Sequence, residues 1–252
     1  LFREREACAE RTQHDLRDSL RSKHLEFESV PLANAVFVWA GPGDRATICQ
    51  GKNCRVATKG KFHYPRERQY VTNLPPVRPT PPPLNLGGIN ASTLKPITIG
   101  FSDTGFAWQH ADLKRYRGVQ QPSGDPHAFN WLDAFGMCAA PCDENTDGHG
   151  TGVAGEAMLS LPTDVPVNFI GCRDTLTGDD DDTYFVTCLD FLWAPFDANG
   201  NRSPALGADV VNVSGGCYPL TSTTCSVAVK NELDTLATSG VLVVASAGDI
   251  DK

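Results

Sequence analysis

The chain has 252 residues, of which 40% are apolar and 21% are charged, and its formal net charge is −8. A chain of this size and composition can bury one large hydrophobic core, or a large and a small one, so an intrinsically disordered protein is excluded. The sequence contains no apolar run of about 18 residues, so it predicts no membrane span. The excess of acidic residues argues against nucleic acid as a partner.

The charge is divided unevenly along the chain. Residues 1–70 hold 13 Lys and Arg against 9 Asp and Glu, a net charge of +4, whereas residues 71–252 hold 9 against 21, a net charge of −12. Opposite net charges favour association between the two parts.

Residues 1–70 are predicted to form a small domain of their own. Leu16 and Leu20 lie four residues apart in a charged stretch, which favours an amphipathic helix over residues 13–24, and residues 25–41 are predicted to form a strand. The following stretch, LPPVRPTPPPL, is rich in proline. Proline lacks a backbone N–H donor and holds the chain extended. This composition predicts a linker at residues 71–84 and a larger domain at residues 85–252.

In the larger domain, buried strands alternate with helices. The predicted strands cover residues 97–101, 208–214 and 241–248, and the predicted helices begin near residues 150, 183 and 226. Phe185, Leu189 and Leu192 share one helical face, and Pro195 and Gly240 follow helix ends. Almost continuously apolar strands alternating with helices predict an α/β fold, a parallel sheet with helices on both faces.

Nine cysteines are many for a chain of this size, and most of them form local pairs in the sequence. The pairs are Cys49 with Cys54, Cys138 with Cys142, Cys172 with Cys188, and Cys217 with Cys225, which leaves Cys8 over. This pattern favours disulfides and therefore a secreted protein. Zinc at Cys138 and Cys142 is the alternative, although no second paired spacing with His follows them.

Two ionisable residues stand where apolar runs give way to small residues. Asp103 ends the strand at residues 97–101, and His149 lies between glycines at the start of a predicted helix. Ligands of parallel sheets bind at the carboxyl ends of strands, where Asp103, Ser214 and Asp249 also fall. Hydrolysis of an amide by a serine needs a base and a carboxylate that orients it. We therefore expect Asp103 and His149 to meet within hydrogen-bonding distance at the edge of the sheet.

Several short motifs follow one another along the chain: DTG at residues 103–105, DGHGTGVAG around His149, ADVVNVSGG ending at Gly216, and VLVVASAGD ending at Asp249. In this order they resemble the motifs of the subtilisin-like serine peptidases. The stretches HAFNWLDA, PCDENTDGHG and FLWAPFDANG are similar to the bacillopeptidase-type branch. The resemblance implies a secreted endopeptidase acting on protein or peptide substrates, with Asp103 orienting His149 as the general base. It also implies that Ser214, Gly215 and Gly216 pair with the substrate backbone.

The resemblance extends to residues 1–70, where TQHDLRDSL and PLANAVFVWA are similar to the inhibitory propeptide of this family. It implies a small α+β propeptide that binds its own peptidase domain in cis and is cleaved within or just after residues 64–84. The G-T-S motif that carries the nucleophile is absent from the sequence. The serine is therefore expected beyond residue 252, and the fragment alone is expected to be inactive.

Two positions depart from the pattern of the family. Gly152 stands where a larger residue usually follows the HGT triplet, and Asp249 stands where most members have the Asn that donates to the oxyanion. Loss of such a donor typically costs about 100- to 1,000-fold in turnover, although a protonated Asp still donates. The alternative function is therefore a catalytically inactive pseudopeptidase that acts as a binding or inhibitory protein.

No cofactor is required by this chemistry, and structural calcium is the remaining possibility. Asp143, Asn145, Asp147 and Gly148 match the first half of a calcium-binding loop, but Ala154 stands where a glutamate is needed. The acidic run of residues 179–182 is interpreted as a solvated loop before a helix that begins near Thr183, with calcium as the less favoured option. A calcium-dependent adhesive module is a third candidate function.

Overall fold

The computed structural model describes residues 2–30, 33–40, 44, 48, 61–63, 93–120, 124–143, 148–162, 165–176, 179–217 and 226–246. The predicted linker at residues 71–84, the predicted pair Cys49 and Cys54, the Cys225 predicted to pair with Cys217, and Asp249 lie outside this part of the chain. None of the helices in the described residues is long and apolar enough to cross a membrane.

The N-terminal unit consists of a long helix and a β-hairpin. Helix α1 covers Phe2–Ser22, so the predicted helix exists but begins earlier than residue 13. Strands β1 (Glu26–Val30) and β2 (Ala35–Trp39) pair antiparallel. The prediction of one strand over residues 25–41 was therefore wrong, because the chain reverses between them, where Asn34 adopts a left-handed φ of 47°.

A five-stranded parallel sheet forms the centre of the molecule, in the order β10-β8-β4-β6-β5. The strands are β4 (Ile97–Asp103), β5 (Trp131–Asp133), β6 (Val167–Arg173), β8 (Val210–Val213) and β10 (Leu242–Ala245). Three of them, β4, β8 and β10, fall within or overlap the predicted strands. Strand β6 was not predicted, although the mostly apolar stretch at residues 167–172 stands directly after Pro166 and ahead of Asp174.

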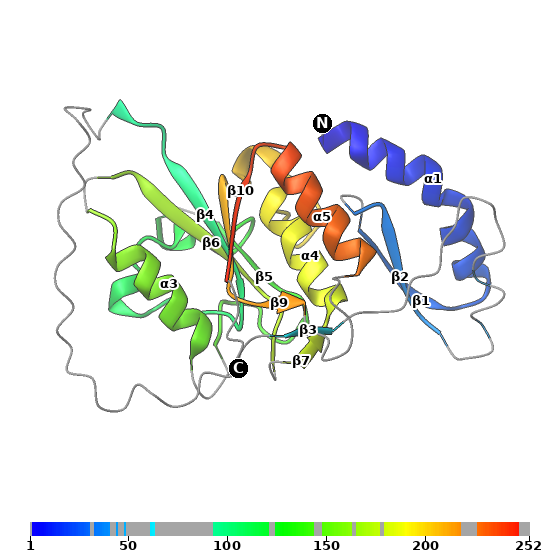
Figure 1. The fold of residues 1–252 in the computed structure, drawn as a ribbon, viewed down its shortest axis with the longest axis horizontal. Helices are drawn as coiled ribbons and strands as arrows, with labels where there is room; N and C mark the ends of the chain where they lie inside the picture. Colours follow the sequence, from blue (N-terminus) through cyan, green and yellow to red (C-terminus); the bar gives the residue numbers. More distant parts are fainter. Residues whose placement is uncertain are drawn as a thin grey trace, which may run out of the picture.

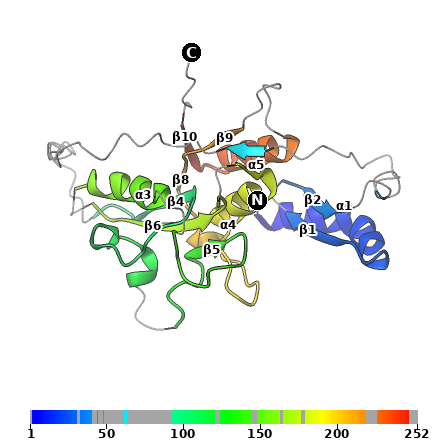
Figure 2. The same cartoon turned by 90° about the horizontal axis from the view of Figure 1, so that it is seen from below.

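Helices cover both faces of this sheet, as predicted. Helix α3 (His149–Leu159) lies on one face, and α4 (Asp182–Trp193) and α5 (Val227–Thr238) lie on the other (Figure 1). The β1–β2 hairpin packs on the outer side of α4, and α1 lies beyond it. Figure 2 shows the same succession of layers from below. Short 3-10 helices η2 (Ala111–Leu113), η3 (Arg117–Gln120) and η4 (Pro204–Leu206) lie in the connections.

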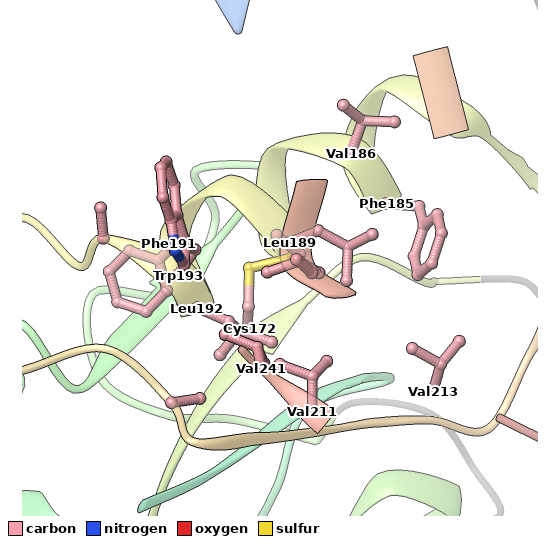
Figure 3. Packing of buried hydrophobic residues seen from close by; sticks show 14 of the residues in the cluster. Cys172, Phe185, Val186, Leu189, Phe191, Leu192, Trp193, Val211, Val213 and Val241 are labelled. Atoms are coloured by element: carbon pink, nitrogen blue, oxygen red, sulfur yellow. A yellow bond between two sulfur atoms is a disulfide. The ribbon is translucent and has the colours of Figure 1, made fainter. Parts of the chain in front are cut away.

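The larger hydrophobic core lies between the sheet and α4 and α5 (Figure 3). Helix α4 is buried around most of its circumference, because the hairpin covers the side that faces away from the sheet. A disulfide joins Cys172 of β6 to Cys188 of α4 within this core, and a second disulfide joins Cys138 to Cys142. Two of the predicted pairs are thereby confirmed, and Cys8 belongs to neither disulfide.

A second, three-stranded sheet has the order β7-β3-β9. Strand β3 (Lys61–His63) from the N-terminal region pairs antiparallel with β7 (Asp179–Asp181) on one side and with β9 (Gly216–Cys217) on the other. The acidic run is therefore not a solvated loop, since three of its residues form β7 and the fourth, Asp182, begins α4. A local pattern of like charges could not reveal this strand, because its partner comes from more than 100 residues earlier in the chain.

Glu232 of α5 is a buried carboxyl group at the helix layer. Its side chain is fully buried, and neither carboxyl oxygen has a hydrogen-bond partner among the described residues. Burial raises the pKa of Glu232 well above its ordinary value, and the charge of Asp190 raises it further, against the opposing effects of Arg202 and Arg5.

Replacing Glu232 by Gln is expected to stabilise the protein in alkaline but not in acidic solution. Because the folded-state pKa is raised, the carboxyl group contributes stability that is present below its unfolded pKa and lost as the pH rises through the folded value. For each kcal/mol by which the substitution raises the free energy of unfolding at pH 8, the melting temperature should rise by about 2–4 °C. This difference should shrink toward pH 4. Thermal unfolding at both pH values tests this, and an equal shift at pH 4 and pH 8 would contradict it.

Candidate active site

Asp103 and His149 meet at the carboxyl edge of the parallel sheet. Asp103 is the last residue of β4, the central strand, and His149 is the first residue of α3. The imidazole Nδ1 of His149 lies 2.7 Å from Oδ1 of Asp103, and the two side chains are 10% and 2% exposed. An ionised carboxylate only accepts hydrogen bonds, so this contact holds the proton on Nδ1 and leaves Nε2 as the basic nitrogen.

The backbone around the pair is packed too closely for side chains. Gly105 has a φ of +104°, and a Cβ there would come 1.9 Å from the carbonyl oxygen of Cys142. At Gly150 a Cβ would come 2.0 Å from the carbonyl oxygen of Gly105 and 3.0 Å from Oδ1 of Asp103. The glycines that flank Asp103 and His149 in the sequence therefore allow the strand end and the helix start to touch.

Asp143 connects the two segments that carry the pair. Its Oδ2 accepts hydrogen bonds from the backbone N–H (2.9 Å) and the hydroxyl (2.5 Å) of Thr151, and its Oδ1 accepts one from the hydroxyl of Thr104 (3.0 Å). Thr104 follows Asp103, and Thr151 lies two residues after His149. The loop of Asp143 was interpreted as part of the histidine motif, with calcium binding as the less favoured option, and no role was predicted for either threonine, although both stand inside the DTG and HGT motifs.

The loop that carries Asp143 is fixed by buried polar groups and by a disulfide. The carboxylate of Asp133 accepts hydrogen bonds from the backbone N–H groups of Phe135, Met137 and Cys138. Arg173, fully buried at the end of β6, lies 3.6 Å from this carboxylate and contacts both sulfurs of the Cys138–Cys142 disulfide. The position of Asp143 is therefore determined by several covalent and polar constraints.

The segment predicted to pair with substrate lies near the carboxyl ends of β8 and β10. Ser214 follows β8 and accepts a hydrogen bond from the side chain of Asn212, and the hydroxyl of Ser246 donates to the carbonyl of Gly215. Gly216 begins β9 and pairs with His63 of β3. Of the predicted segment, Gly216 therefore pairs antiparallel with a strand from the N-terminal part of the same chain, whereas Ser214 and Gly215 precede β9.

Two other histidines lie near the site in sequence, and each has a structural contact. Nδ1 of His127 lies 3.1 Å from the hydroxyl of Tyr116, and its ring packs against Trp108. Nδ1 of His110 accepts a hydrogen bond from the backbone of Asp112 at the start of η2. These contacts give both histidines a structural role, and neither residue is assigned a role in catalysis.

The described residues do not offer a metal site that fits the chemistry of calcium or zinc. Asp133, Cys138 and Cys142 are close enough together to bind an ion, but the two sulfurs are bonded to each other and are not thiolate ligands. Both carboxylate oxygens of Asp143 are already used by threonines. Of the remaining expected calcium ligands, Asn145, Asp147 and the side chains of residues 179–181 lie outside the described part.

Comparisons with known proteins show that the chain is similar to serine peptidases. It is 32% identical over 124 residues to bacillopeptidase F of Bacillus subtilis (strain 168), an alignment that covers 45% of this chain and 8% of that protein. It is 31% identical over 160 residues to subtilisin DY of Bacillus licheniformis, covering 61% of this chain and 47% of that protein. No family model matches the chain.

The fold is also that of a solved serine protease. The epidermin leader peptide processing serine protease from Staphylococcus aureus superimposes with a TM-score of 0.53 at 14% identity, covering 93% of this chain and 57% of that structure. The chain spans less than half the length of the curated relatives it matches. It is thus similar in sequence to peptidases of the subtilisin family, and it has an α/β fold like that of a serine protease.

Proposed function

We propose that this chain is part of a secreted, subtilisin-like serine endopeptidase. Asp103 orients the imidazole of His149, which takes the proton of a serine hydroxyl as general base and returns it to the leaving amine as general acid. The serine belongs to a part of the longer protein outside residues 1–252, and Asp249 stands where the sequence motif of similar peptidases has the oxyanion donor. Two disulfides support an oxidising compartment.

The observation that carries this proposal is the hydrogen bond between Asp103 and His149. A buried carboxylate 2.7 Å from Nδ1 of a histidine is the arrangement that fixes the tautomer of a general base and stabilises its cation. Its place at the carboxyl end of the central parallel strand is where sheets of this kind bind their ligands. The similarity to bacillopeptidase F and subtilisin DY supports the same chemistry.

We further propose that the N-terminal region is an inhibitory propeptide. Its strand β3 pairs with Gly216 and Cys217 of β9 on one side and with β7 on the other, and a substrate would add to the sheet as a strand in the same way. A peptide substrate cannot use these backbone groups while β3 occupies them. Cleavage within or just after residues 64–84 would allow β3 to leave.

The contact between the hairpin and α4 and α5 supports this assignment. Glu28 of β1 accepts a hydrogen bond from the hydroxyl of Thr187 in α4, and Val30 and Ala33 are buried in the core that α4 and α5 form. The net charges of +4 in residues 1–70 and −12 in the remainder also favour association.

Labelling of the full-length protein with a fluorophosphonate probe tests the peptidase function. The probe should modify a serine outside residues 1–252, and His149→Ala should abolish the labelling because the hydroxyl loses its base. Sequencing the N-terminus of the mature protein should find a start within or just after residues 64–84. An active enzyme that keeps residues 1–70 would refute the propeptide, whereas a folded protein that the probe never labels would favour a pseudopeptidase.

A further inference from the structure

The start of α3 lacks the ordinary side-chain cap. Its N-cap residue is Gly148, in the left-handed conformation, and no side chain of its own satisfies the first N–H groups of the helix. Two of these groups are satisfied from elsewhere, since the N–H of Gly150 donates to the hydroxyl of Thr104 (2.9 Å) and that of Thr151 donates to Asp143 (2.9 Å). The helix that begins at His149 is therefore capped by groups from the end of β4 and from the loop of Asp143.

The directions of these hydrogen bonds require the side chain at position 143 to be a group that only accepts. The Thr104 hydroxyl accepts from Gly150, and the Thr151 hydroxyl accepts from the backbone N–H of Ala107 (3.0 Å). Each hydroxyl therefore has its own proton available for Asp143, which lies within hydrogen-bonding distance of both. An ionised carboxylate accepts from both hydroxyls and from the Thr151 N–H at once, whereas an amide of the same shape must present a donor to one side.

Asp143 also approaches the strand end through its backbone. The N–H of Phe106 donates to the carbonyl of Cys142 (3.1 Å), and Gly105 and Asp143 form an isolated antiparallel bridge. The Cys138–Cys142 disulfide ties this backbone to the Asp133 turn. Residues 104–107, 142–143 and 150–151 are therefore joined as one unit, with Asp103 and His149 at its centre.

The surroundings of Asp143 oppose its negative charge in part. Burial raises the pKa of Asp143, hydrogen bonds from Thr151 and Thr104 lower it, and the charge of Asp103 raises it, with a net rise above the ordinary value. Ionised Asp143 is thus held at a cost in free energy, next to a second buried carboxylate. Groups that cost stability at a site are commonly kept for the geometry that they impose.

We propose that Asp143 is a positioning residue, whose ionised carboxylate holds the start of α3 against the end of β4 and so aims the imidazole of His149 at Asp103. The inference rests on the proposed peptidase function. Asp143 acts through its hydrogen bonds to Thr104 and Thr151, which stand close to Asp103 and His149 in the chain. Its loss should therefore change the orientation of the base more than the binding of substrate.

Replacing Asp143 by Asn in the full-length protein tests the proposal. Misplacing a catalytic group by about 1 Å can cost about 100-fold in rate, so kcat should fall by about 10- to 100-fold while KM changes little. The NMR resonance of the proton between His149 Nδ1 and Asp103 should shift or broaden in the same variant. Asp112→Asn, which makes the same chemical change on a 46% exposed side chain, should leave kcat, KM and the resonance unchanged.

If Asp143→Asn does not fold, variants of Thr151 test the same proposal. Thr151→Val keeps the shape and the backbone N–H but removes the hydroxyl, and it should lower kcat, whereas Thr151→Ser should restore it. A folded Asp143→Asn variant with unchanged kcat and an unchanged His149 resonance would overturn the proposal. If the unmodified protein hydrolyses nothing, the peptidase function fails, and the resonance alone then decides whether Asp143 positions His149.

Discussion

Asp103→Asn is expected to lower the kcat of the mature full-length peptidase by about 10,000-fold. The buried carboxylate accepts a hydrogen bond from Nδ1–H of His149 at 2.7 Å. In the proposed mechanism it balances the positive charge that the imidazole gains when it takes the serine proton. An amide has no charge, and its NH₂ group favours the tautomer in which Nε2 carries the proton and cannot act as a base. Steady-state hydrolysis of a peptide ester or amide from pH 6 to pH 10 measures the effect.

Binding of substrate provides the control for this variant. Because Asp103 is 2% exposed and lies beneath His149, its replacement should leave KM close to the value of the unmodified enzyme. Fluorophosphonate labelling should slow in parallel with kcat, since the same base activates the serine for both reactions. Full activity of a correctly folded Asp103→Asn protein would rule out the proposed triad.

Gly150→Ala is expected to separate β4 from α3 and to abolish activity. The new methyl group would stand 2.0 Å from the Gly105 carbonyl oxygen, a backbone atom that cannot rotate away, and 3.0 Å from the carboxylate oxygen of Asp103 that binds His149. Overpacking of this kind costs about 1–3 kcal/mol, and the shift should remove at least about 100-fold of the rate. Thermal unfolding, kcat and the Nδ1 proton resonance of His149 should all change.

Gly152→Ala supplies a matched control two residues along the same helix. Its Cβ would meet no atom within 4 Å, and the residue is exposed. Alanine is the better helix former by about 0.8–1 kcal/mol, so this variant should be slightly more stable and fully active. Equal losses of activity in the two variants would show that the space around Gly150 does not matter.

Local sequence patterns were enough to predict the elements that depend on burial alone. The apolar run at residues 97–101 predicted β4, and the spacing of Phe185, Leu189 and Leu192 predicted α4, since a buried face imposes its own period on the sequence. Short separations likewise identified the Cys138–Cys142 and Cys172–Cys188 pairs. Contact between residues 1–70 and the remainder was expected from their opposite charges and from the resemblance to a propeptide, but neither specified which elements touch.

Elements that depend on distant partners could not be predicted in this way. Strand β3 pairs with β7 and β9 across more than 100 residues, and nothing in the sequence of Lys61–His63 specifies those partners. Strand β6 lies between β4 and β5, a position decided by the packing of the whole sheet. The free energy of such pairings belongs to contacts between segments and not to the residues of either segment.

The same distinction between local sequence and distant contacts applies to the site. The sequence by itself determined the chemical types, a carboxylate at Asp103 and an imidazole at His149, each beside the glycines that a close approach requires. Only the tertiary structure decided that the two lie 2.7 Å apart and that Asp143 forms hydrogen bonds with Thr104 and Thr151 beside them. A motif specifies which groups are present, whereas their distance and direction follow from how β4, α3 and the disulfide-bonded loop pack together.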